Sequence, residues 1–135
     1  MVATPRACST AGWPQALVRV RNRATLRDLR PDLAAILAFE RADGVLAWCD
    51  DGDATSFAQR FFAPRIGIDE DPATGSAAGA LGALRVYEGA APGAITVRQG
   101  EEIGRPSEIT VTVGALDDVR VGGTAVLLME GELRL

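Results

Sequence analysis

The chain has 135 residues, which suffices for one domain with a single core and no covalent cross-links. Its 18 acidic and 14 basic residues give a net charge of -4, a balance that argues against a nucleic-acid partner. The basic residues are all arginine, so a general acid or base must be a carboxylate, a cysteine, a tyrosine or a group that a partner supplies.

The sequence carries no signal for export or for a membrane. No apolar run approaches the roughly 20 residues of a membrane span, and Arg6, Thr10 and Pro14 interrupt the stretch where a signal peptide would lie. Cys8 and Cys49 are too few to form a disulfide framework. We therefore expect a cytoplasmic protein with no membrane partner and with both thiols free.

The first third of the chain predicts one strand and one helix. Residues 1–14 lack clear periodicity and are expected to form a loose lead-in. Residues 16–21 alternate in polarity, which predicts a half-buried strand whose even-numbered residues face the core. Thr25 and Asp28 have the spacing of a capping box. A helix is expected over about 31–39, where apolar residues recur at helical spacing.

Two strands and an unusual helix are predicted next. Segments 44–49 and 56–62 are typical of strands. The segment 75–87 has no polar stripe in its first ten residues, and a helix that is apolar all round is a buried helix. Its internal glycines, Gly79 and Gly82, each cost about 1 kcal/mol relative to alanine. Close approach of another backbone must offset this cost, so we expect the helix to pass through the middle of a sheet.

Beyond Pro92 the chain alternates short apolar runs with glycine-containing turns, a pattern typical of strands. The predicted strands are 95–98, 109–113, 119–121, 125–129 and 132–135. A helix-bearing half followed by a run of strands, with no linker between them, predicts a single α+β domain over residues 1–135.

The segment most suited to chemistry is Glu70-Asp71-Pro72-Ala73-Thr74-Gly75-Ser76, where a predicted loop at 64–74 enters the buried helix. The first N–H groups of a helix lack intrahelical partners and point out of an end that carries partial positive charge. Gly75 permits close approach of a ligand and Ser76 adds a hydroxyl, which together suit a carboxylate or another small anion. Asp71 precedes them and could exchange a proton with a ligand held there.

Simpler interpretations of the same residues remain open at this point. Thr74 could be an ordinary helix cap, with Asp71 only offsetting the helix dipole. Asp69, Glu70 and Asp71 could bind a metal ion, although no histidine or spaced fourth ligand accompanies them. Arg60 could bind a substrate or form a structural ion pair with these carboxylates.

Several ordered blocks resemble the phenazine-biosynthesis-like (PhzF-type) isomerase family, and the likeness runs from about Ala11 to the C-terminus. The blocks are Arg60 to Pro64, Gly67-Ile68, Glu70 to Ala77, Gln99-Gly100, Gly104 to Ser107 and Val121 to Gly123. Because the blocks occur in the family's order, they are a more specific signal than one short motif.

The resemblance implies a fold similar to that of diaminopimelate epimerase, in which two domains each wrap a strongly curved, mostly antiparallel sheet around a central buried helix. This chain is similar to the second domain only, and the first domain is expected to be absent. By this analogy Asp71 matches the active-site aspartate, and Thr74, Gly75 and Ser76 match the residues that bind the substrate.

The resemblance also implies a function. It predicts a cofactor-independent isomerase, without a metal, that transfers a proton on a small carboxylate-bearing metabolite. Since the family's first domain supplies a glutamate and a histidine, the chain is expected to need a partner, either an N-terminal-half protein or a second copy in a homodimer. The alternative is a non-catalytic half-domain that binds a small acid or dimerises.

Overall fold

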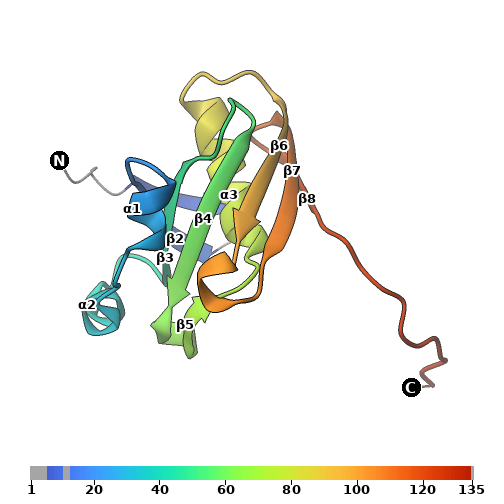
Figure 1. Ribbon diagram of the computed structural model, residues 1–135. Coiled ribbons are helices and arrows are strands. Elements are labelled where there is room, and N and C mark those ends of the chain that lie inside the picture. The colour runs from blue at the N-terminus through green and yellow to red at the C-terminus, as the bar shows by residue number, and fades with distance from the viewer. Residues whose placement is uncertain (1–5, 11–12, 135) are drawn as a thin grey trace.

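The computed structural model describes residues 6–10 and 13–134 of the chain (Figure 1). Its elements in chain order are β1 (Arg6–Thr10), β2 (Trp13–Arg19), α1 (Arg23–Arg27), α2 (Leu33–Ala38), β3 (Gly44–Asp50), β4 (Ser56–Ala63), the 3₁₀ turn η1 (Pro64–Ile66), β5 (Ile68–Asp71), α3 (Gly75–Tyr87), β6 (Gly93–Gln99), the 3₁₀ turn η2 (Glu101–Ile103), β7 (Ser107–Ala115) and β8 (Asp118–Gly122).

The strands form one curled sheet in the order β1-β2-β3-β4-β6-β7-β8, and β5 pairs with β4 off this path. The β2–β3 and β4–β6 pairs are parallel, and the other described pairs are antiparallel. Parallel neighbours need a crossover connection. Helices α1 and α2 lie in the first crossover and α3 in the second. The α+β prediction is thus confirmed as a mixed, curled sheet with few helices.

Strands β3 and β4 are buried on both faces, because α3 packs on one side of the sheet and the α1–α2 pair on the other. Successive side chains of a strand point to opposite faces. Leu46 and Trp48 of β3 therefore join the core with α3, whereas Cys49 packs with α1. The same alternation in β4 directs Gln59 toward the start of α3 and Arg60 toward α1.

Helix α3 has the predicted bounds, and its residues 77–84 are all buried. Its glycines lie where strands β7 and β8 come closest. A Cβ at Gly82 would lie 2.9 Å from Cγ1 of Val111, and one at Gly79 would lie 3.3 Å from Cγ2 of Val121. Close packing at these glycines is confirmed, but the neighbouring atoms belong to valine side chains of β7 and β8 and not to another backbone.

Four segments differ from their prediction. Residues 6–10 form β1 rather than a loose lead-in, and part of the predicted loop at 64–74 forms β5. The strands predicted at 125–129 and 132–135 are wrong for the described residues, because 123–134 contain no strand or helix and project from the body (Figure 1). A strand requires a neighbour to pair with, which composition alone does not reveal.

Local capping also differs. Asn22 caps α1 by accepting a hydrogen bond from the Thr25 N–H at 2.9 Å, so Thr25 lies inside the helix and the predicted capping box is wrong. Strand β2 is buried on both faces over part of its length, since Ala16 and Leu17 are 4% and 2% exposed. Helices pack on both sides of the sheet there, which the alternation of polarity did not indicate.

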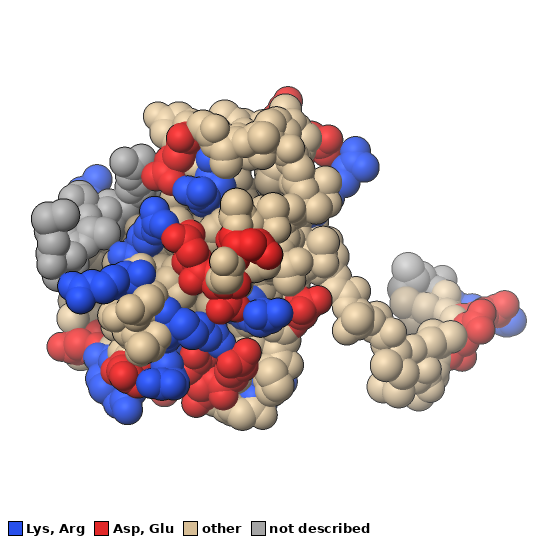
Figure 2. Space-filling view, turned by 45° about the horizontal axis from the view of Figure 1, so that its top comes forward, with Lys and Arg blue, Asp and Glu red and all other residues tan. Residues whose placement is uncertain are grey.

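Positive and negative side chains intermingle over the face shown in Figure 2, and the segment after β8 extends away from it. Within the described ranges, no helix has the length and apolar character that crossing a membrane requires.

Candidate functional site

The predicted segment forms the turn that joins β5 to α3. Strand β5 ends at Asp71, which pairs with Phe61 of β4, and α3 begins at Gly75 directly after its N-cap residue Thr74. The short turn 72–74 therefore brings an acidic side chain to the N-terminus of a buried helix.

Thr74 occupies the N-cap position, but its side chain does not cap the helix. Its hydroxyl instead donates to Oδ2 of Asp71 over 2.6 Å, and the residue is only 7% exposed. The interpretation of Thr74 as a helix N-cap is thus confirmed for its position, but its side chain makes no capping hydrogen bond. The hydroxyl that would normally bond the helix N–H groups is committed to Asp71.

A cavity of about 380 Å³ opens at this turn. Three of the predicted residues, Asp71, Thr74 and Ser76, line it together with Gln15 and Asp43. Its large apolar lining residues are Trp13, Phe61, Ile66 and Ile68. The cavity thus combines an apolar wall with a carboxylate and a helix N-terminus, which is the usual composition of a small-molecule site.

Gly75 and Ser76 differ in their surroundings. A Cβ at Gly75 would meet Cγ1 of Val121 at 3.2 Å, so the missing side chain makes room for β8. Ser76 is exposed and accepts a hydrogen bond at Oγ from Nε2 of Gln15 at 3.2 Å. Gln15 is 2% exposed, and its amide oxygen has no partner among the described residues. A buried amide on β2 therefore orients the hydroxyl at the edge of the cavity.

Two further amides, Gln59 and Gln99, lie beneath the turn and are completely buried. Gln99 accepts from the Thr74 N–H and donates to Thr74 Oγ1, both at 2.9 Å. Gln59 donates to Oε1 of Gln99 at 2.6 Å. Oε1 of Gln59 has no partner in the described part of the chain. A buried polar atom without a hydrogen-bond partner destabilises a fold, so its presence requires a specific reason. The support that Gln59 gives to this turn through Gln99 provides one.

Asp43 is a second carboxylate in the cavity. It lies in the loop before β3, and its Oδ1 is 3.8 Å from Nε of Arg65, with both side chains about one-third exposed. Sequence reasoning missed it because a lone acid in a loop matches no motif. Asp43 and Asp71 are distant in the sequence, and the fold places both in the wall of the same cavity.

Arg60 has a structural role. Its Nε and Nη2 donate to the two carboxylate oxygens of Glu70 at 2.8 Å each, and its Nη1 donates to the carbonyls of Leu26 and Leu29. The hydrogen-bonded Glu70 carboxylate raises the pKa of Arg60. Arg60 thus fastens α1 to the sheet, which decides against a substrate-binding role.

The Arg60–Glu70 pair argues against Glu70 as a metal ligand, because both of its carboxylate oxygens already accept hydrogen bonds from Arg60. The ranges described above contain no cluster of histidine, cysteine, aspartate or glutamate that could hold a metal ion. Cys49 is a free and buried thiol, and burial raises its pKa.

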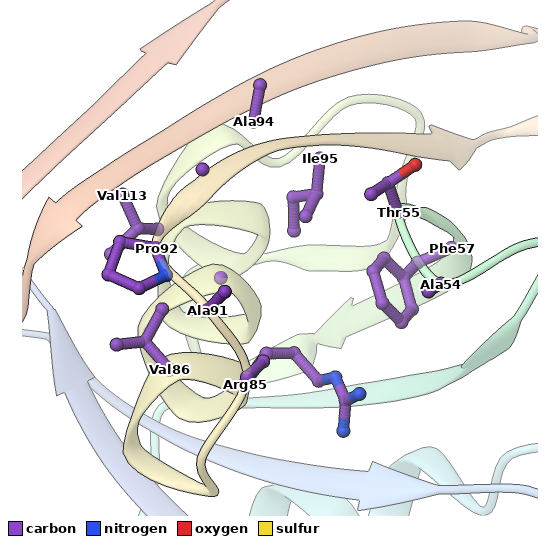
Figure 3. Close-up of a pocket in the computed structure, with 13 residues that line it drawn as sticks. Ala54, Thr55, Phe57, Arg85, Val86, Ala91, Pro92, Ala94, Ile95 and Val113 are labelled. Atoms are coloured by element: carbon purple, nitrogen blue, oxygen red, sulfur yellow. The ribbon is translucent and has the colours of Figure 1, made fainter.

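A second cavity, of about 410 Å³, lies near the C-terminal end of α3 (Figure 3). The guanidinium carbon of Arg85 lies 5.6 Å from the ring centre of Phe57, and its Nη1 is 3.5 Å from Glu88. The described residues that line this cavity include no carboxylate or thiol. We therefore place the candidate site at the first cavity, which Asp71 lines with a carboxylate.

The fold and the site define a mixed α+β protein with a carboxylate-lined cavity at the N-terminus of a buried helix. A match to the family described as phenazine biosynthesis-like protein covers residues 1–131. An uncharacterized isomerase of Deinococcus radiodurans is 37% identical over 94% of this chain and 45% of its own length.

Solved structures agree with this match. The structure of a predicted epimerase from Pseudomonas aeruginosa has a TM-score of 0.63 and 36% identity, over 90% of this chain and 43% of that one. A phenazine biosynthesis protein of the PhzF family from Enterococcus faecalis has a TM-score of 0.67 and 26% identity, over 95% and 48%. The chain belongs to the phenazine biosynthesis-like family. It spans about half the length of the curated Deinococcus radiodurans relative.

Proposed function

We propose that this chain forms one wall of an isomerase active site in which a proton is moved on a small carboxylate-bearing metabolite without a cofactor. The observation that carries the proposal is a single cavity lined by Asp71 and Ser76 at the start of α3. Relatives named as an isomerase and a predicted epimerase support this class of reaction.

The geometry suggests a role for each residue. The N-terminus of α3 at Gly75 and Ser76 suits the ligand's carboxylate, because the aligned N–H groups of a helix start attract anions. Asp71 would receive or return the proton on the adjacent carbon. Thr74, which the resemblance assigns to substrate binding, would contribute to the cavity wall and orient Asp71, since its hydroxyl already bonds that carboxylate.

Isomerisation by proton transfer requires a group that removes the proton and a group that returns it. The chain contains neither lysine nor histidine. We propose that a partner supplies the main base, either an N-terminal-half protein matching the rest of the relatives' length or a second copy in a homodimer. In this arrangement the chain is the second domain of a diaminopimelate-epimerase-like fold, with the sheet wrapped around α3, in a cytoplasmic enzyme.

The proposal can be tested by hydrogen–deuterium exchange into substrate. The chain, alone and co-purified with products of neighbouring genes, is incubated with a panel of small carboxylic acids in D₂O. Exchange next to a carboxylate is read by mass spectrometry. Asp71→Asn should abolish the exchange. Asp69→Asn should not, because Asp69 is exposed on the same strand and does not line the cavity. Exchange that survives Asp71→Asn would refute the role of this residue.

Asp43 offers an internal control for the partner's contribution, since it is the other carboxylate in the cavity. If the partner supplies the base, Asp43→Asn should leave most of the exchange intact. If the chain alone exchanges the substrate proton and Asp43→Asn abolishes the reaction, the base lies within this chain and no partner is required.

A non-catalytic, dimerising half-domain is the second candidate, and the projecting C-terminal segment favours it. Residues 126–129 are 81–91% exposed and apolar, and exposed apolar segments mark interaction sites. Sedimentation gives the mass in solution, and a thermal-shift titration with small carboxylic acids detects binding. Binding without exchange would support this candidate, whereas a stable monomer would argue against both homodimer versions.

A further inference from the structure

The amide of Gln99 makes as many hydrogen bonds as its two polar atoms allow. Oε1 accepts from the Thr74 N–H at 2.9 Å and from Nε2 of Gln59 at 2.6 Å. Nε2 donates to Oγ1 of Thr74 at 2.9 Å and to the carbonyl oxygen of Asp71 at 2.5 Å. Because a backbone N–H can only donate, the atom that faces it must be the amide oxygen. The neighbours of Gln99 therefore fix its orientation.

This orientation also fixes the direction of the single hydroxyl proton of Thr74. Its Oγ1 accepts a hydrogen bond from Nε2 of Gln99, so its own proton is directed to Oδ2 of Asp71, 2.6 Å away. Oδ1 of Asp71 accepts only a long hydrogen bond, of 3.5 Å, from the Ala73 N–H among the described residues. The turn thus holds Oδ2 of Asp71 by a short bond and Oδ1 only by a long one, so Oδ1 is the oxygen with capacity to bond a ligand in the cavity that Asp71 lines.

The segment after Gln99 holds the turn from its other side. Oγ of Ser107 donates to the carbonyl oxygen of Pro72 at 2.8 Å. Gly100 has φ +85°, and a Cβ there would lie 2.7 Å from the same Pro72 oxygen and 2.2 Å from that of Arg105. A side chain at position 100 would therefore displace the backbone that carries Asp71. The β6–β7 connection is built around this turn.

We propose that Gln99 is a positioning residue that acts through Thr74 to present one oxygen of Asp71 to a ligand in the cavity. The catalytic consequence rests on the proposed function, but the hydrogen-bonded chain itself is testable without turnover. An error of about 1 Å in the placement of a reacting group can cost about 100-fold in rate. A carboxylate that transfers protons therefore benefits from fixed neighbours.

The first test measures exchange of the Gln99 side-chain amide protons with water by NMR, on the full chain labelled with ¹⁵N. They should exchange at least about tenfold more slowly than those of the exposed Asn22. Thr74→Ser keeps the hydroxyl and should preserve slow exchange, whereas Thr74→Val should accelerate it and shift both resonances. Amide protons that exchange as fast as those of Asn22, or that do not respond to Thr74→Val, would overturn the proposal.

The second test uses the assembled enzyme. Thr74→Val should lower kcat by about 100-fold while KM changes less than about twofold, and Thr74→Ser should restore most of kcat. Gln99→Met should match Thr74→Val, with circular dichroism as the control for folding. Equal losses for the serine and valine variants, or a loss confined to KM, would contradict positioning. A wild-type protein without turnover would refute the proposed function, and the exchange measurement would still decide the role of Gln99.

Discussion

Replacing Gly82 with alanine should destabilise this protein, although the same change stabilises an ordinary exposed helix by about 1 kcal/mol. A Cβ at Gly82 would lie 2.9 Å from Cγ1 of Val111 and 3.0 Å from Cγ2 of Val113, closer than packed carbon atoms normally come. Both valines are buried, at 0% and 2% exposed. Relief would require strand β7 to move, and overpacking of a core costs about 1–3 kcal/mol. We expect a net loss of about 1 kcal/mol.

Gly79 provides the matched control on the same helix. A Cβ there would lie 3.3 Å from Cγ2 of Val121, which is 46% exposed on the edge strand β8 and has room to turn aside. Gly79→Ala should therefore stabilise the protein by about 0.5–1 kcal/mol. Urea denaturation of the two variants and the wild type gives the free energies of unfolding. If Gly82→Ala proves as stable as Gly79→Ala, the account of close approach by β7 is wrong.

Three further predictions follow from burial and charge. Glu70→Gln removes the charge that pairs with Arg60, whose side chain is 7% exposed. It should lower the free energy of unfolding, measured by urea denaturation, by about 3 kcal/mol. An unchanged urea midpoint would show that the ion pair contributes nothing to stability. Burial raises the pKa of Cys49 in the folded protein. The resulting contribution to stability is complete below the pKa of this thiol in the unfolded chain, about 8.5, and is lost as the pH rises through its pKa in the folded protein. Urea midpoints between pH 7 and 10 should show this decline in the wild type and a smaller one in Cys49→Ala. Deletion of residues 124–135 should change the free energy of unfolding by less than about 0.5 kcal/mol, because residues 126–129 are 81–91% exposed. The deletion should also reduce self-association, as measured by sedimentation. A large loss of stability would mean that the segment packs on the rest of the domain.

The parts of the fold that the sequence predicted are those with a strong local signal. Helix α3 was predictable because its first ten residues contain no polar stripe, and β4 because 56–62 is rich in aromatic and apolar residues. Strand β5 was not, since Ile68–Asp71 is mostly acidic and becomes a strand only by pairing with β4. The segment 125–129 shows the opposite error, because it has the composition of a strand and no neighbour within the described chain.

The candidate site divides in the same way. Asp71 and the start of α3 are adjacent in the sequence, so their proximity could be predicted from the turn between them. Gln15, Gln59 and Gln99 reach the turn from β2, β4 and β6, and only the sheet brings them together. One signal was available beforehand. A glutamine at an inward position of an apolar strand must find a hydrogen-bond partner in the core.

These buried amides bear on the choice between the two candidate functions. Gln59 and Gln99 are both 0% exposed. If the turn 71–74 moved away, Gln99 would lose its hydrogen bonds to Thr74 and Asp71, at a cost of about 1–3 kcal/mol for each polar group left without a partner. The stability of the core thus holds Asp71 in one position. A half-domain that only dimerised or captured an acid would gain little from such rigidity. Proton transfer between fixed positions does benefit, so this network favours the isomerase proposal over the non-catalytic one.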